Sequence, residues 1–137
     1  MNAQISAKTI QNLIDAARKA QMNAYAPYSK FQVGAALLAE NGEIIAGANV
    51  ENASYPAAIC AERSAVCSAI AQGLRNFVAI GLMTSGAKPA WPCGICRQVL
   101  AEFAPNMPVY SAGNSGEVEM STVAELLPKR FGPDDLP

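Results

Sequence analysis

The first regular pattern of apolar residues lies between Ser6 and about Met22. Its apolar side chains recur at helical spacing, namely at Ile10, Leu13, Ile14 and Ala17. This spacing predicts an amphipathic helix with one face turned toward a core. A Pro-Tyr-Ser turn at residues 27–29 closes this part of the chain.

Two apolar runs follow, from Phe31 to Ala39 and from Glu43 to Val50. They are separated by Asn41-Gly42, and Asn-Gly is a strong signal for a two-residue hairpin turn. The two runs therefore predict a pair of antiparallel strands.

The remaining pattern alternates between helical and strand segments. Cys60 to about Gln72 and Cys93 to Phe103 predict helices, whereas Phe77 to Met83 and the residues around Val109 predict buried strands. The order helix, hairpin, helix, strand, helix, strand predicts parallel crossovers. We expect one α/β domain over residues 1–137, a three-layer α/β/α sandwich around a mixed sheet of about five strands.

Composition narrows the possible chemistry. The chain of 137 residues contains no histidine, which excludes a Ser-His-Asp triad, an HExxH metal helix and a Cys2His2 finger. With 51% hydrophobic and 15% charged residues, it has enough apolar material for the core of a single domain. Any bound metal must therefore be held by thiolates and carboxylates.

Charge and hydropathy bear on location and partners. The chain does not open on a secretory signal pattern, and its longest apolar stretch, residues 33–39, is far shorter than the ~20 residues of a membrane helix. Ten basic and eleven acidic residues give a net charge of -1, without a run of Lys or Arg suited to a phosphate backbone. We expect a soluble cytoplasmic protein with neither a nucleic-acid nor a membrane partner.

Two short segments carry the candidate chemistry, Cys60 to Arg63 and Pro92 to Cys96. Together they offer three thiolates for one metal ion and one acid, Glu62, beside them. A zinc site with three protein ligands keeps its fourth position for water, whereas a site with four is closed and structural. Glu62 stands two residues from a proposed ligand and can shuttle a proton without binding the ion.

Both segments lie where a predicted helix begins, so the helix N-termini turn their partial positive charge toward the site. This favours thiolates over thiols. Three thiolates on a divalent ion leave a charge of about -1, which Arg63 and Arg97 could offset by donating hydrogen bonds to sulfur. Outside such a site, either arginine would be an ordinary surface cation.

The sequence gives less support to two other roles for the cysteines. A closed site with Cys67 as fourth ligand would join Cys60 and Cys67 across about 10 Å of one helix, too far for metal–sulfur bonds of about 2.3 Å. Cys67 is instead expected to be a small buried residue. A redox dithiol at Cys93 and Cys96 would leave Cys60 and Glu62 without a task. A non-catalytic zinc-stabilised interaction domain remains an alternative.

At these residues the chain resembles the small homotetrameric cytidine deaminases, a zinc-dependent type, and does so over nearly its whole length. The spacing of Cys60-Ala61-Glu62 and Pro92-Cys93-Gly94-Ile95-Cys96 is typical of zinc deaminases. Three further segments resemble family motifs: residues 25–36 (YAPYSKFQVGAA), 49–53 (NVENA) and 126–133 (LLPKRFGP). Four motifs in the same order are far more specific than one.

The resemblance implies hydrolytic deamination of cytidine and deoxycytidine to uridine and deoxyuridine, with release of ammonia. Cys60, Cys93 and Cys96 would hold one zinc ion per subunit, with the open position left for water. Glu62 would pass a proton from the water to N3 of cytosine and then protonate the departing ammonia. Arg63 would support the site from beside Cys60.

The resemblance also implies contacts to the substrate. Asn49 and Glu51 would hydrogen-bond the ribose hydroxyls, the backbone at Ala61 would meet the base, and Phe31 would line the pyrimidine pocket. Two aromatic residues would come from neighbouring subunits of a homotetramer with shared active sites, namely Tyr55 and Phe131. From residue type alone, Phe31 and Tyr55 would be core aromatics and Glu51 a solvated charge.

Glu51 also favours one class of substrate. A carboxylate beside the sugar suits neutral hydroxyls and repels a phosphate, which favours a nucleoside over a nucleotide or a nucleic acid. Blasticidin deaminases share the two cysteine segments and are the nearest alternative family, but Arg63, residues 49–52 and residues 131–133 favour a cytidine deaminase. Trp91 stands where such enzymes often have a small residue, so its ring would reshape the mouth of the pocket.

Overall fold

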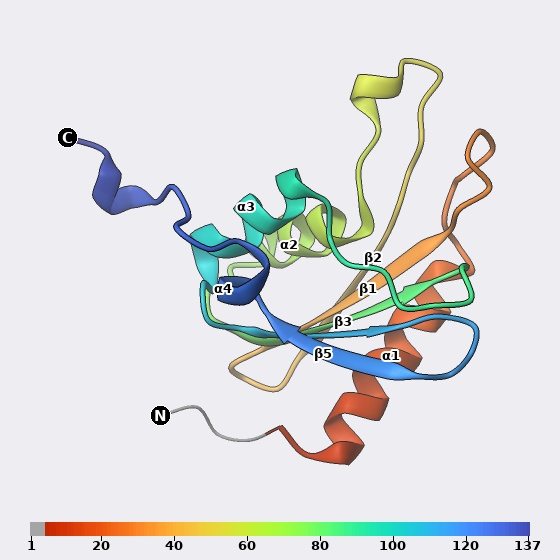
Figure 1. The fold of residues 1–137 in the computed structure, drawn as a ribbon, viewed down its shortest axis with the longest axis horizontal. Helices are drawn as coiled ribbons and strands as arrows, with labels where there is room; N and C mark the ends of the chain where they lie inside the picture. The colour runs from red at the N-terminus through yellow and green to blue at the C-terminus, as the bar shows by residue number, and fades with distance from the viewer. Residues whose placement is uncertain (1–4) are drawn as a thin grey trace.

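A five-stranded sheet forms the centre of this computed structural model, which describes residues 5–137 (Figure 1). The strands lie in the order β2-β1-β3-β4-β5. Their bounds are Val33–Ala39 for β1, Ile44–Ala48 for β2, Phe77–Thr84 for β3, Pro108–Ala112 for β4 and Val118–Thr122 for β5.

The sheet is mixed, as predicted. β1 pairs antiparallel with both β2 and β3, and β4 pairs antiparallel with β5, whereas β3 and β4 are parallel. A parallel pair needs a crossover, which helix α3 (Gly94–Phe103) supplies. Helix α2 (Ala61–Ala71) makes the other crossover, from β2 to β3 past the intervening β1.

Helices cover both faces of the sheet, which confirms the three-layer α/β/α architecture. Alternate residues of β1 point to opposite faces, because successive side chains of a strand do so. Ala36 packs with Leu13 and Ile14 of helix α1 (Ala7–Gln21), whereas Leu37 belongs to the core formed with α2 and α3. The Ser6 side chain caps α1 by accepting a hydrogen bond from the Thr9 backbone N–H.

The predicted hairpin is also confirmed, with Gly42 in the left-handed region at φ +94°. Strand β5 and helix α4 (Val123–Leu126) were not anticipated from the sequence. Val118–Thr122 is an edge strand with mostly exposed side chains. Val118 and Met120 alternate with polar residues, but five residues with only two apolar side chains give a weak strand signal. Two short 3-10 helices, Tyr55–Ala57 and Pro133–Asp135, were likewise missed.

Gly47 on β2 sets how closely helix α2 approaches the sheet. A Cβ atom at this position would lie 2.4 Å from the backbone nitrogen of Ala65 and 2.6 Å from the carbonyl oxygen of Ala61. Because both atoms belong to the helix backbone, a side chain here would push α2 away. Gly47 therefore fixes the position of the first turn of α2, which carries Glu62.

Gly47→Ala should lower the free energy of unfolding by about 3 kcal/mol, the upper part of the usual range for overpacking. Gly132→Ala is the matched control, because a Cβ at Gly132 meets no heavy atom within 4 Å and its φ is -146°. Urea unfolding at equal protein and zinc concentrations measures the free energy of unfolding of both variants. If the two variants are equally stable, close packing of α2 on β2 is not a constraint on this fold.

Candidate metal centre and active site

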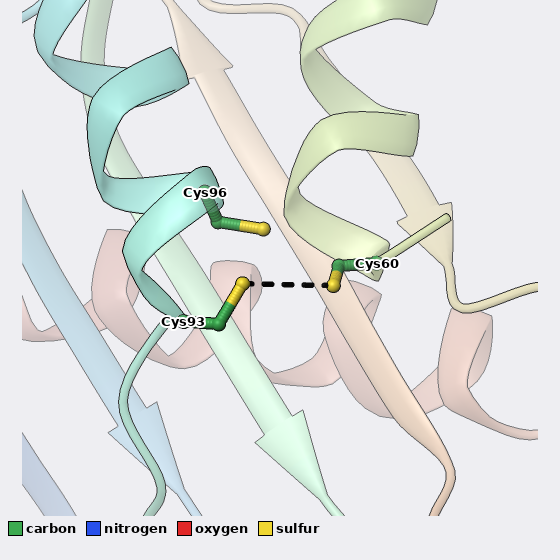
Figure 2. Close-up of side chains that lie close together, drawn as sticks. All are labelled: Cys60, Cys93 and Cys96. Carbon is green, nitrogen blue, oxygen red and sulfur yellow. Dashed lines mark hydrogen bonds between the residues drawn. The ribbon is translucent and has the colours of Figure 1, made fainter. Parts of the chain in front are cut away.

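The three predicted metal ligands come together at the starts of two neighbouring helices, with their sulfur atoms turned toward one another (Figure 2). Cys60 is the N-cap residue of α2 and Cys93 that of α3, while Cys96 is buried in the first turn of α3. All three sulfur atoms lie within 4.8 Å of one another. The Sγ atoms of Cys60 and Cys93 are 3.9 Å apart.

These thiols fit a zinc ion. Sulfur ligands of a tetrahedral zinc site with bonds of about 2.3 Å stand about 3.8 Å apart, close to the separation of Cys60 and Cys93. Borderline-soft zinc accepts thiolate ligands, and three of them leave a fourth position. The donor set and its spacing therefore suit a catalytic rather than a closed structural site.

Hydrogen bonds in the cluster favour a thiolate at Cys60. The bond with the Cys96 side chain, followed by that from Arg63, lowers the pKa of Cys60 to about 5, although burial acts in the opposite direction. The bond with Cys60 in turn raises the pKa of Cys96. Arg63 Nη2 donates to Cys60 Sγ at 3.6 Å, which confirms the expected arginine–sulfur contact. Arg63 Nε is buried and has no hydrogen-bond partner among residues 5–137.

Within residues 5–137, Arg97 does not donate to sulfur, so the role considered for it beside the thiolates is wrong. Its Nε donates to the Pro92 carbonyl at 2.7 Å and its Nη1 to the Leu126 carbonyl at 2.8 Å. The guanidinium thus joins the loop before Cys93 to the end of α4. Because α3 points Arg97 toward these carbonyl groups, its role is to hold two segments of the chain together.

Glu62 lies in the first turn of α2 with only 6% of its surface exposed. Burial raises the pKa of its carboxyl group to about 7, and the negative charge of Cys60 acts in the same direction, whereas a hydrogen bond with its own backbone N–H opposes the shift. A carboxyl group that titrates near neutral pH can both accept and donate a proton there. This is the behaviour that a general acid and base needs.

A pocket of about 270 Å³ opens in front of Glu62 and the thiols. It is bounded by the start of β1, the segment after β2, the end of β3 and the starts of α2 and α3. Its lining residues are Ser29, Phe31, Val33, Asn49, Glu51, Cys60, Ala61, Glu62, Leu82, Thr84, Ala90, Trp91 and Cys93. The pocket thus brings together most of the residues that the sequence suggested for one site.

The polar side chains at the sugar end of the predicted site are held by backbone groups. Asn49 Oδ1 accepts from the Val33 N–H at 2.8 Å, and its Nδ2 donates to the Phe31 carbonyl at 2.9 Å. Glu51 accepts backbone hydrogen bonds from Tyr28 and Ser29. Hydrogen bonds from Ser29 lower the pKa of Glu51, which keeps it ionised.

The aromatic residues divide into two groups. Phe31 lines the pocket and is 41% exposed, so it is not the core residue that residue type alone would suggest. Tyr55 is 71% exposed and Phe131 is 58% exposed, and neither belongs to the pocket lining. Tyr55 stacks edge-on against Tyr28, and the Phe131 carbonyl accepts from Gln98 Nε2 at 2.9 Å.

Cys67 and several lining residues differ from what the sequence indicated. Cys67 is exposed on α2, so its assignment as a buried residue is wrong, although it does lie outside the thiol cluster as expected. Leu82 and Thr84 were not anticipated, because a strand pattern does not show which strand end faces a pocket. Ser29 lies within the segment that resembled a family motif, which is the only signal that could have identified it.

Comparison with known proteins agrees with this geometry. Residues 7–112 match the family model described as the cytidine and deoxycytidylate deaminase zinc-binding region. A cytidine deaminase from Sporosarcina psychrophila is 48% identical, over 93% of this chain and 94% of that protein. Another, from Halalkalibacterium halodurans, is also 48% identical, over 92% of this chain and 96% of that protein.

Solved structures show the same fold. The crystal structure of a cytidine deaminase from Burkholderia pseudomallei superposes with a TM-score of 0.85 at 45% identity, covering 88% of this chain and 98% of that one. The cytidine deaminase from Mycobacterium tuberculosis gives a TM-score of 0.78 at 35% identity, covering 89% of this chain and 96% of that one. With its thiol triad, its buried acid and these full-length likenesses, the chain belongs to the cytidine deaminase family of zinc-binding hydrolases.

Proposed function

We propose that this chain catalyses the hydrolytic deamination of cytidine and 2′-deoxycytidine to uridine and 2′-deoxyuridine, with release of ammonia. The observation that carries the proposal is the buried carboxyl group of Glu62 in the same pocket as the thiols of Cys60 and Cys93. A zinc-stabilised domain without activity would need the thiols but no buried acid beside them.

Cys60, Cys93 and Cys96 would hold the zinc ion, which would supply Lewis-acid activation of a water molecule for attack on C4 of the base. Glu62 accepts a proton from this water and delivers it to N3. The same carboxylate then takes the proton of the new C4 hydroxyl and passes it to the C4 amino group, so that the C4 carbonyl forms as ammonia leaves. In all, one water adds across the C4=N3 bond of the ring, and the bond from C4 to the amino group breaks to release one ammonia.

Four other residues bind the substrate in this proposal. Phe31 packs against the pyrimidine, and the backbone of Ala61, at the start of α2, meets the polar edge of the base. Asn49 and Glu51 hydrogen-bond the sugar hydroxyls. The ionised Glu51 would repel a phosphate on the sugar, which favours a nucleoside over a nucleotide.

We further propose that the chain acts as one domain in a cytoplasmic homotetramer whose sites are shared between subunits. The proposal is supported by Phe131 and Tyr55, which are largely exposed and do not line the pocket of their own chain. A neighbouring subunit would bring these rings to the pocket and bury them, which stabilises both the assembly and the bound base. No helix within residues 5–137 has the length and apolar character of a membrane span.

The wild type should release ammonia from cytidine, and Glu62→Gln should lower kcat by at least ~100-fold, as the loss of a general acid and base usually does. The amide matches the carboxyl group in size but cannot carry the proton. Zinc content and unfolding midpoint, measured on the same samples, should be unchanged. Loss of zinc together with activity would instead make Glu62 a ligand, and absence of ammonia release from the wild type would refute the proposed reaction.

Cys96→Ser should reduce zinc content to well below one ion per chain, because a serine hydroxyl is a much poorer ligand for zinc than a thiolate. Cys67→Ser is the matched control within the same chain, since Cys67 lies on α2 outside the thiol cluster. It should keep both zinc and activity. Metal analysis after dialysis measures the difference, and zinc loss in Cys67→Ser would contradict the three-thiol assignment.

Mixing Phe131→Ala with Glu62→Gln should give more activity than the average of the two separate samples. After subunit exchange, some sites combine an intact Glu62 from one chain with an intact Phe131 from another. Native mass spectrometry should follow the exchange, and the deamination rate should rise with it. Complete exchange without any gain in rate would show that each site uses residues of one chain alone.

A further inference from the structure

The carboxylate of Glu51 is held by three hydrogen bonds from two consecutive residues. Its Oε1 accepts from the backbone N–H groups of Tyr28, at 3.0 Å, and Ser29, at 3.1 Å. Its Oε2 accepts from the Ser29 hydroxyl. Two of the three donors are fixed backbone groups, and the third is a side chain that can be removed by mutation.

The hydroxyl of Ser29 has a second partner. It accepts a hydrogen bond from the Phe31 N–H at 3.0 Å, across Lys30, whose backbone is in the left-handed region at φ 61°. This conformation is unfavourable for a residue other than glycine and persists only where the surroundings hold it. The hydroxyl therefore lies between Glu51, proposed to bind the sugar, and Phe31, proposed to pack on the base.

The number of acceptor positions on Glu51 limits what it can bind. An ionised carboxylate accepts about four hydrogen bonds, two on each oxygen. Tyr28 and Ser29 occupy both positions on Oε1, whereas the Ser29 hydroxyl occupies one of the two on Oε2. One acceptor position on Oε2 is left within a pocket that Ser29 and Glu51 both line.

We propose that Ser29 is a positioning residue for sugar recognition, whose hydroxyl fixes the carboxylate of Glu51 so that Oε2 presents its remaining acceptor position to one sugar hydroxyl. The inference rests on the proposed function, in which Glu51 binds the sugar. Without the Ser29 hydroxyl, Oε2 is free to rotate toward water while the backbone still holds Oε1. The loss in kcat/KM should then be confined to substrates that carry the sugar hydroxyl.

The test compares cytidine with 2′,3′-dideoxycytidine, which has the same base but lacks both ring hydroxyls of the sugar. Ser29→Ala should lower kcat/KM for cytidine by about tenfold, mostly through KM, as expected for a weakened hydrogen bond to a charged group. For the dideoxy substrate the change should stay within about twofold. Ser29→Thr keeps the hydroxyl and should restore selectivity for cytidine.

Ser85→Ala is the matched control for general loosening of this part of the chain. The Ser85 hydroxyl accepts from the Gln32 N–H at 3.0 Å, next to Phe31, and within residues 5–137 it has no hydrogen bond to Glu51. Any loss in this variant should be equal for the two substrates. Ser29→Cys has a side chain of similar size with a weaker hydrogen-bond donor, so its selective loss of kcat/KM for cytidine should be smaller. This variant replaces Ser29→Ala in the test if Ser29→Ala does not fold.

Three results would overturn the inference or its basis, and they are distinguishable. An equal loss for both substrates in Ser29→Ala would show that Ser29 supports the segment around Phe31 instead of Glu51. An unchanged kcat/KM for cytidine would show that the backbone donors alone hold the carboxylate. A wild type that is inactive on both nucleosides would refute the proposed function itself.

Discussion

The convergence of two helix N-termini on one point is the constraint on which the rest of this structure depends. Cys60, Cys93 and Cys96 can serve one metal ion only if α2 and α3 begin side by side, with their sulfur atoms within 4.8 Å. The sheet makes this possible, because both helices are crossover connections that pack on the same face of the sheet. Gly47 allows α2 to lie against β2, and the parallel pairing of β3 with β4 fixes the path of α3.

The same convergence produces the electrostatics of the site. Partial positive charge at the helix N-termini and the guanidinium of Arg63 favour a thiolate at Cys60. Burial and the negative charge of Cys60 have the opposite effect on Glu62, because they disfavour a second anion nearby. These opposite effects suit sulfur to hold a metal ion and the Glu62 carboxyl group to move protons.

The far end of the pocket depends on backbone hydrogen bonds. Asn49 and Glu51 form hydrogen bonds with the start of β1 and the segment before it. Each side chain therefore has few donor or acceptor positions left for a substrate. In the proposed function, these remaining positions would bind the sugar hydroxyls. The rings of Tyr55 and Phe131 are exposed and lie outside the pocket of their own chain, and in the proposed tetramer they would cover the pocket of a neighbouring subunit.

The sequence by itself determined the three longer helices α1, α2 and α3, the hairpin and the residue types of the metal centre, because periodicity and ligand spacing are local properties. It did not show the edge strand β5 or the exposure of Cys67, which depend on what lies beside them in space. Only the tertiary structure decided that Arg63 reaches sulfur while Arg97 reaches carbonyl groups, since both follow a ligand in sequence. It also decided the link between Ser29 and Glu51, which are 22 residues apart and meet only when the strands pair.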